Sequence, residues 1–317
     1  MRKVLLIALV VAALATALVA AGCGSSSSSG SSSAKAGGMT AAQILAKSGQ
    51  AMTKVTSASF TADVTLKVSS TGSSAQTALL GQAPIVLHVA GKAGDKSAGD
   101  GAVVAMTLKV SGQTLVMGLK TVGPRTWLGF QGKWYVVPPS KTAGAKNTGT
   151  SSSKVVGSLG IDPQKWAASS TVTTEQLDGA TVYHVVSTAD TAKVMVDIVN
   201  ALNSPALSKA TGSSAATLNR LKSSGELKSL EKSLVSASTQ SWIDAKTFML
   251  LKGTLAAKLQ LSSGSSTQGV SGLGIDVAYT LGNLGQPVTV TPPAHALPLK
   301  ALTTGLSSLT SGAGAGL

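Results

Sequence analysis

The chain of 317 residues is 43% hydrophobic and 12% charged, so a sizeable apolar core is possible and disorder throughout is excluded. Aromatic residues make up 3% of the sequence, which makes the buried surface mainly aliphatic and disfavours base-stacking surfaces for nucleic acid. The net charge of +14 fits an anionic membrane surface or nucleic acid, or serves solubility alone. One cysteine and three histidines leave little room for a disulfide framework or a zinc site, so we expect no metal and no cofactor.

Residues 1–22 are expected to be an export signal. Arg2 and Lys3 form a short positive segment, and the uncharged apolar stretch 4–21 follows and ends in small residues. This stretch is also long enough to serve as an uncleaved membrane anchor, which is one alternative. A second alternative is that Cys23 is a buried core residue, but its place between an export signal and a serine run disfavours this.

The residues Ala20, Ala21, Gly22 and Cys23 resemble the lipobox of bacterial lipoproteins, with Ala20 where that motif usually has leucine. The resemblance implies cleavage by signal peptidase II between Gly22 and Cys23, and a diacylglyceryl group on the Cys23 thiol. Two or more acyl chains hold a protein durably on a bilayer, where one does not. The expected location is therefore the extracytoplasmic face of the cell membrane, in the cell envelope, with Cys23 as the lipid anchor.

Residues 23–38, which follow the signal, are expected to be a Ser/Gly-rich tether without the capacity to bury a core. A tether of this length has a root-mean-square span of roughly 20 Å, which keeps the domain close to the membrane. The folded domain is expected over 39–293, and 294–317 after the two prolines are expected to be a loose tail.

The pattern from Met39 onward predicts an α+β domain. Thr40 and Gln43 can form a capping box at the start of a helix over 40–54. Residues 59–69 alternate apolar and polar side chains with period two, which is typical of a half-exposed antiparallel strand. The same alternation predicts about ten strands, nearly all joined as a meander. The strand segments lie within 59–69, 85–92, 103–110, 113–120, the hairpin of 127–130 and 133–137, 172–178, 181–187, 236–243, 248–261 and 275–281.

Two segments interrupt the predicted sheet. Residues 138–154 are a polar loop, and 190–235 carry helices. Asp190 is suited to cap a helix over 191–202. A second helical stretch is predicted from the spacing of Leu227, Leu230 and Leu234.

A wide sheet with one apolar face must cover that face, and two short helices can cover only part of it. The alternation alone leaves two alternatives, an ordinary aliphatic core or a cavity that takes an apolar guest. The residues predicted to line such a cavity are Phe60, Val64, Leu66, Leu87, Val104, Met106, Leu108, Leu115, Met117, Leu251, Leu255, Leu259 and Val277.

Five segments occur in a fixed order behind the lipobox: TAAQILAKSGQAMTKVTSASFTADVTL, TWLGFQGKWYVVPP, VYHVVSTAD, SWIDAKTFMLLKGTLAAKL and VAYTLGNLGQPVTVTPP. Over about residues 39–292 this order resembles the LppX/LprG-type lipoproteins of actinobacteria. The resemblance implies a LolA/LolB-like fold, a curved antiparallel β half-barrel with helices over its concave face. Within it, Trp134 and Tyr135, and the WID segment at Trp242 to Asp244, match structural signatures. The loop 138–154 and the serine-rich stretch 203–235 depart from the family pattern.

The resemblance implies that the protein binds an acylated lipid or glycolipid in an apolar cavity and carries it between membrane or envelope partners. A membrane transporter is a possible partner, and we expect a monomer. The cavity mouth is expected at the loops 138–154 and 203–217, where Lys141, Lys146 and Lys154 either meet acidic head groups or form a solvated loop. The alternative function is an envelope sensor or scaffold that acts through protein contacts.

Catalysis is not expected. His88, His184 and His295 are scattered, and no G-x-S-x-G elbow, P-loop or H-E-x-x-H motif occurs. Nucleic-acid binding is disfavoured by export and by basic residues that are dispersed along the chain.

Overall fold

The computed structural model describes residues 35–70, 83–95, 97–138, 166–194, 233–260 and 270–302, without the side chains of Ala167 and Val270. Several predicted features lie outside these residues. They are the export signal, Cys23 with most of the tether, 139–154 of the polar loop with its three lysines, 195–202, 203–217, Leu227, Leu230 and the tail from 303.

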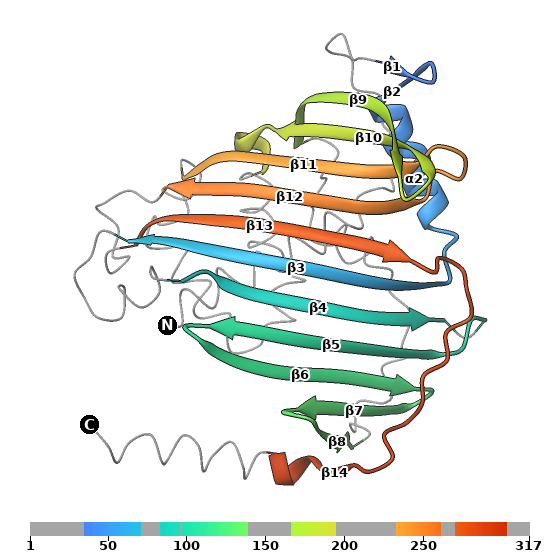
Figure 1. Cartoon of the computed structure of the whole chain (residues 1–317), viewed down its shortest axis with the longest axis vertical. Helices are drawn as coiled ribbons and strands as arrows, with labels where there is room; N and C mark the ends of the chain where they lie inside the picture. The colour runs from blue at the N-terminus through green and yellow to red at the C-terminus, as the bar shows by residue number, and fades with distance from the viewer. Residues whose placement is uncertain are drawn as a thin grey trace. The chain divides into compact units, whose positions relative to one another are not determined.

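The described residues form a twelve-stranded sheet in the order β14-β8-β7-β6-β5-β4-β3-β13-β12-β11-β10-β9 (Figure 1). The strands are β3 (Ser57–Ser70), β4 (Ile85–Gly94), β5 (Gly101–Val110), β6 (Gln113–Val122), β7 (Arg125–Phe130), β8 (Lys133–Val137), β9 (Ala167–Leu177), β10 (Ala180–Ala189), β11 (Leu234–Asp244), β12 (Leu250–Gln260), β13 (Val270–Gly282) and β14 (Leu297–Pro298). The pairs from β4 to β8 and from β9 to β13 are antiparallel, and β14 pairs in parallel with β8. The predicted fold class, an α+β antiparallel half-barrel, is confirmed.

Three hairpins have two-residue turns whose residues both have positive φ. These are Ser111 and Gly112 (47° and 79°), Gln131 and Gly132 (48° and 79°), and Asp178 and Gly179 (51° and 82°). Positive φ at both central residues is the type I′ geometry, whose twist matches that of paired strands. Glycine at the second position of each turn therefore fixes the register of β5–β6, β7–β8 and β9–β10.

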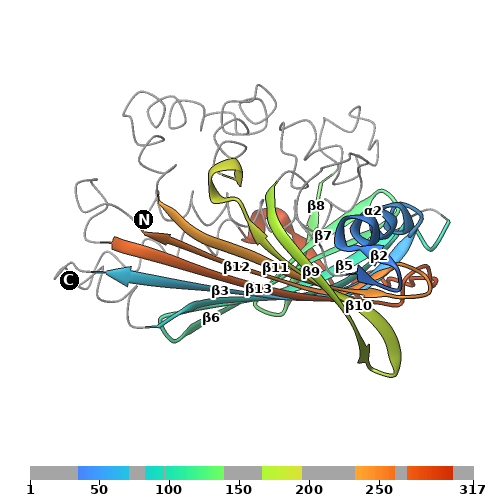
Figure 2. The same ribbon diagram turned by 90° about the horizontal axis from the view of Figure 1, so that it is seen from above.

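The chain divides into two compact units, which share β3. The first unit contains the second half of β3, the strands β9 to β13, and the helix α2 (Ala41–Met52). The predicted capping box is present, because Thr40 Oγ1 accepts from the Gln43 N–H and Gln43 Oε1 accepts from the Thr40 N–H. Ile44 is 0% exposed, and Figure 2 shows α2 lying over the face of the sheet beside β9.

Helix formation after β10 begins as predicted. The carboxylate of Asp190 accepts hydrogen bonds from the N–H groups of Ala192 (3.1 Å) and Lys193 (3.3 Å). The backbone hydrogen bond from Lys193 is the main reason why the pKa of Asp190 lies below its usual value. Asp190 is therefore the N-cap of this helix, which the described residues follow to Val194.

Three local predictions differ from the structure. Leu234 was assigned to a helix but begins β11, where it pairs with Leu259. Lys35–Ala36 in the predicted tether form β1 and pair with β2 (Met39–Thr40). Leu297–Pro298 in the predicted tail pair with β8. The last two pairings depend on tertiary contacts, for which two-residue strands carry no periodic signal.

The second unit contains the first half of β3, the strands β4 to β8, and the chain after β13. Residues 283–296, which we call the C-terminal strap, run past the ends of β4 to β7 to reach β14 (Figure 1). The Gly285 N–H donates to the Ser57 carbonyl (2.8 Å), and the Val288 N–H donates to the Ala98 carbonyl (2.7 Å). Val288 is buried, so the strap seals this end of the unit.

Gly99 is required for the close approach of the strap. Its φ is +120°, and a Cβ at this position would overlap the carbonyl oxygen of Val288. We expect Gly99→Ala to lower the free energy of unfolding by roughly 2–4 kcal/mol, since positive φ and overpacking both contribute. Gly112→Ala is the matched control, because Gly112 has a φ of +79° but nothing within 4 Å of its Cβ position. Urea unfolding measures both variants, and equal losses would contradict a tight strap.

Candidate functional site

Aliphatic side chains form continuous rows across β4, β5 and β6. Cross-strand partners share a face of an antiparallel sheet, so the register shows which side chains lie together. One row contains Leu87, Leu108 and Leu115, the next Val89, Met106, Met117 and Phe130, and a third Gly91, Val104, Leu119, Leu128 and Tyr135. We call the face that carries these rows the aliphatic face of the second unit.

Phe60 extends this aliphatic face onto β3. A Cβ on Gly91 would lie 2.8 Å from Cζ of the Phe60 ring, so the missing side chain of Gly91 makes room for the ring. Gly91 pairs with Val104, which places the ring at the third row. The predicted lining residues of this unit therefore share one face.

The aliphatic face is only partly buried. Every predicted lining residue on it remains partly exposed to solvent: Phe60, Leu87, Val104, Met106, Leu108, Leu115 and Met117. The three rows as named contain no charged side chain. The second row meets its first charged residue at Lys133, the partner of Phe130. A half-exposed aliphatic surface of this kind is unusual for a protein core and is typical of a binding surface.

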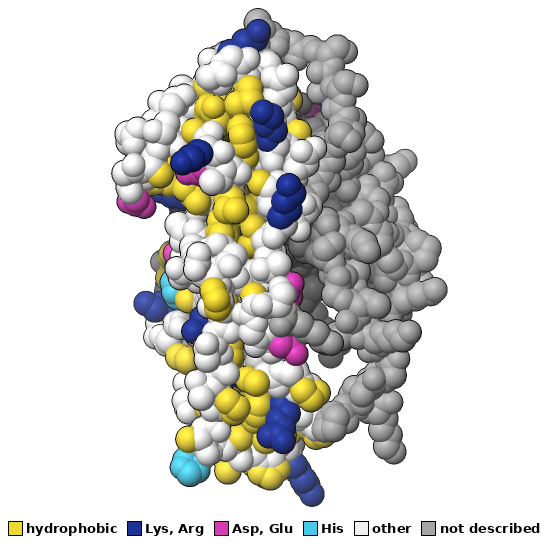
Figure 3. Space-filling model, turned by 90° about the vertical axis from the view of Figure 1, so that its right-hand side faces the viewer, with side chains coloured by type: hydrophobic (Ala, Val, Ile, Leu, Met, Phe, Trp, Pro, Cys, Tyr) yellow, Lys and Arg dark blue, Asp and Glu magenta, His cyan; other side chains and the backbone are white. Residues whose placement is uncertain are grey.

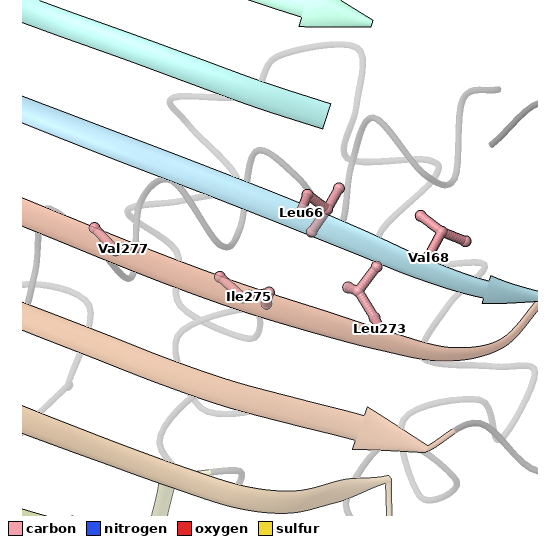
Figure 4. Close-up of a cluster of buried hydrophobic side chains, with 5 residues drawn as sticks. All are labelled: Leu66, Val68, Leu273, Ile275 and Val277. Carbon is pink, nitrogen blue, oxygen red and sulfur yellow. The ribbon is translucent and has the colours of Figure 1, made fainter. Parts of the chain in front are cut away.

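The predicted lining residues of the first unit are arranged differently. Leu66 (6% exposed) and Val277 (7%) belong to a buried cluster with Val68, Leu273 and Ile275 (Figure 4). Val64, Leu255 and Leu259 pack against this cluster. Leu251 lies on the same face of β12 as Leu255 by the alternation of the strand. The residues of the cluster and those packed against it contact each other, which makes this group a core.

Tyr279 places a hydroxyl beside that core. Its ring lies over Gly253, its cross-strand partner, where any side chain would collide with it. Burial raises the pKa of Tyr279 to about 12, so the hydroxyl keeps its proton at neutral pH.

Aromatic rings cover the opposite face of the second unit. Trp134 lies over Gly118 and Gly129, since a Cβ on either glycine would be 2.9 or 3.1 Å from its ring. Lys120 Nζ lies 4.8 Å from the Trp134 ring centroid. Tyr135 is buried and lies on the aliphatic face, at the end of the third row. Trp134 and Tyr135 therefore serve the sheet itself, as their match to a structural signature implied.

The WID segment has a comparable structural role in the first unit. Trp242 stacks on His184 with ring centroids 4.4 Å apart, and Lys252 Nζ lies 4.7 Å from the Trp242 centroid. Trp242 Nε1 donates to Glu175, and His184 Nε2 lies 3.0 Å from Gln240 Oε1. Both rings are thus occupied by protein neighbours.

The other two WID residues fix the strand end and the turn after it. Ile243 is 0% exposed. The Asp244 carboxylate accepts from Lys246 N–H (3.0 Å), Thr247 N–H (2.6 Å) and Thr247 Oγ1 (2.7 Å). Burial alone would raise the pKa of Asp244. The hydrogen bonds lower it by more than burial raises it, so the net pKa is below the usual value. The carboxylate is therefore charged and locally satisfied.

His184 Nδ1 also lies 3.4 Å from Glu175 Oε2. His88 forms a surface pair, in which its Nδ1 lies 2.8 Å from Asp63 Oδ1. Both side chains are about half exposed. Within the described ranges, no three His, Cys, Asp or Glu side chains are grouped to hold a metal ion. None of the helices in this part of the chain is long and apolar enough to cross a membrane.

The solved structures to which this chain is similar include two mycobacterial proteins. The LprF structure from Mycobacterium bovis has 14% sequence identity and a TM-score of 0.37, and the match covers 80% of this chain and 97% of that chain. Lipoprotein LppX from Mycobacterium tuberculosis has 13% identity and a TM-score of 0.33, with 79% and 97% covered. LprF and LppX are mycobacterial lipoproteins of the family that the sequence resembles. No family model and no curated protein matches the sequence.

The difference in burial between the core cluster of the first unit and the aliphatic face of the second can be measured by shortening one leucine in each. We expect Leu66→Ala to lower the free energy of unfolding by about 2–5 kcal/mol, because it leaves a cavity in a packed cluster. Leu108→Ala is expected to cost about 1 kcal/mol or less, because the side chain it shortens is already partly exposed. Denaturant unfolding of both variants gives the comparison. Equal losses would show that Leu108 is an ordinary core residue.

Proposed function

We propose that this chain is a membrane-anchored lipoprotein that binds an acylated lipid or glycolipid on the aliphatic face of its second unit. It carries this lipid between membrane or envelope partners without covalent chemistry. The supporting observation is the row of Leu, Val and Met side chains across β4 to β6, which is aliphatic and partly exposed.

The chemistry of the face suits acyl chains. Burial of apolar surface contributes roughly 25 cal/mol per Å², or about 0.8 kcal/mol for each buried methylene. A long acyl chain therefore binds strongly without a single hydrogen bond. Met106 and Met117 are cross-strand partners at the centre of the rows, and their flexible side chains adapt to guests of irregular shape.

A charge on this face should abolish lipid binding while leaving the sheet intact. We expect Met106→Asp to reduce co-purified lipid at least tenfold, since an acyl chain would bury the carboxylate without a partner. Thr107→Asp is the matched control, because its side chain lies on the opposite face of the same strand. Native mass spectrometry of the purified full chain, followed by lipid extraction, measures the bound lipid per protein.

The same measurement separates the proposal from its alternative. Equal loss of lipid in both aspartate variants would place the site elsewhere. Absence of any non-covalently bound lipid in the unaltered chain would instead favour an envelope sensor or scaffold.

The anchor has its own test. We expect Cys23→Ala to abolish metabolic labelling with a radioactive fatty acid and to yield released protein or unprocessed precursor, because the substitution removes the acylated thiol. Ser25→Ala, two residues later in the tether, should leave labelling unchanged. Fatty-acid labelling that persisted in the Cys23 variant would exclude the anchor assignment.

A further inference from the structure

The sequence distributes its charges unevenly around the tether. Asp63 is the first acidic residue of the whole chain, whereas Lys35, Lys47 and Lys54 all precede it. The helix α2 therefore contains no carboxylate, and its exposed residues include Gln43, Lys47 and Gln50. Spacings of four and three place these side chains on one stripe of the helix.

The turn between β11 and β12 adds a cation beside this stripe. Lys47 Nζ lies 4.8 Å from the centroid of the Phe248 ring, so the helix contacts the turn that carries Lys246. Phe248 has a φ of +60°, an uncommon conformation for a bulky residue, and its ring stacks on Tyr183 with centroids 6.0 Å apart. The Phe248 ring of this turn therefore contacts both Tyr183 and the Lys47 ammonium group.

The first strand brings the tether to the same end of the unit. Tyr183 Oη lies next to Gly37, where a Cβ would be 2.7 Å away from it. Lys35, two residues earlier, is exposed. The chain from Cys23 therefore enters the domain beside α2, and we call Lys35, Lys47, Lys54 and Lys246 the basic edge.

The lysines of the basic edge form no ion pair in the described part of the chain, in contrast to Lys67 with Asp276 and Lys193 with Asp190. The charged carboxylate of Asp244 interacts electrostatically with Lys246, two residues away, so the uncompensated positive charge of the edge comes mainly from Lys35, Lys47 and Lys54. Figure 3 shows lysine or arginine side chains among hydrophobic ones on this side of the molecule.

We propose that the basic edge docks on anionic phospholipid head groups of the membrane that holds the lipid anchor. Charge complementarity selects this occupant, and the entry point of the tether places the edge at the bilayer. Lysine near an anionic membrane surface contributes about 1 kcal/mol, which corresponds to roughly a fivefold change in the docked population per residue. The inference rests on the proposed anchor at Cys23, and it adds an orientation for the anchored domain.

The test uses the lipidated full chain on vesicles. Cys23 is the sole cysteine and is consumed by acylation, so Gln50→Cys on α2 or Ser236→Cys at the far end of β11 accepts a single fluorophore. Energy transfer to a head-group acceptor reports how near each position is to the bilayer. We expect strong transfer from position 50 and weak transfer from position 236 on vesicles of phosphatidylcholine and phosphatidylglycerol in equal parts. Raised salt should abolish the difference.

Charge-matched variants separate the basic edge from net charge. Lys35→Gln, Lys47→Gln, Lys54→Gln and Lys246→Gln together should lower the docked-to-undocked ratio roughly a hundredfold or more. Replacing four exposed lysines elsewhere, Lys92, Lys109, Lys133 and Lys258, by Gln removes the same charge and should leave docking unchanged.

Three outcomes bear on the proposal. Equal transfer from both labels, or equal effects of the two quadruple variants, would overturn it. Attachment to anionic vesicles but not to neutral phosphatidylcholine would support the basic edge while excluding the acyl anchor. Attachment to neither kind of vesicle would overturn both.

Discussion

The removal of one aliphatic face of a long antiparallel sheet from water is the constraint on which this structure depends. Period-two alternation along each strand gathers leucine, valine and methionine on that face, and cross-strand register joins them into rows. Around β3 and β13 the rows close into a cluster of buried side chains. Across β4 to β6 the same kind of row stays partly exposed, so the sheet satisfies the constraint more completely in the first unit than in the second.

Local chemistry was sufficient to predict most elements of the fold. Alternation located the strands, the Thr40 and Gln43 pair located α2, and Asp190 located the next helix, because each signal acts over a few residues. Leu234 was misassigned since leucines at helical spacing also fit a strand that starts at the last of them. The pairing of Leu297–Pro298 with β8 had no sequence signal, because the C-terminal strap rather than a local pattern brings these residues together.

The sequence predicted which residues share the apolar face of the sheet, but not which of them are buried and which are exposed. Leu66 and Leu108 have the same chemistry and the same place in an alternating strand, yet one is buried and the other is partly exposed. The difference comes from what packs opposite each residue. Leu66 meets Leu273, Ile275 and Val277 of β13, which lie more than two hundred residues later in the chain. Sequence periodicity cannot contain such information, because burial is a property of the assembled sheet.

Two tryptophans on the faces opposite the apolar rows are engaged by protein neighbours. Trp134 packs against two glycines in one unit, and in the other Trp242 contacts His184 and Lys252. Because protein groups already contact the faces of these rings, the rings offer no stacking surface for a sugar or base. The aliphatic rows of β4 to β6 remain partly exposed. In a chain with so few aromatic residues, these two tryptophans stabilise the sheet, whereas Phe60 and Phe130 belong to the aliphatic face that we propose binds the lipid.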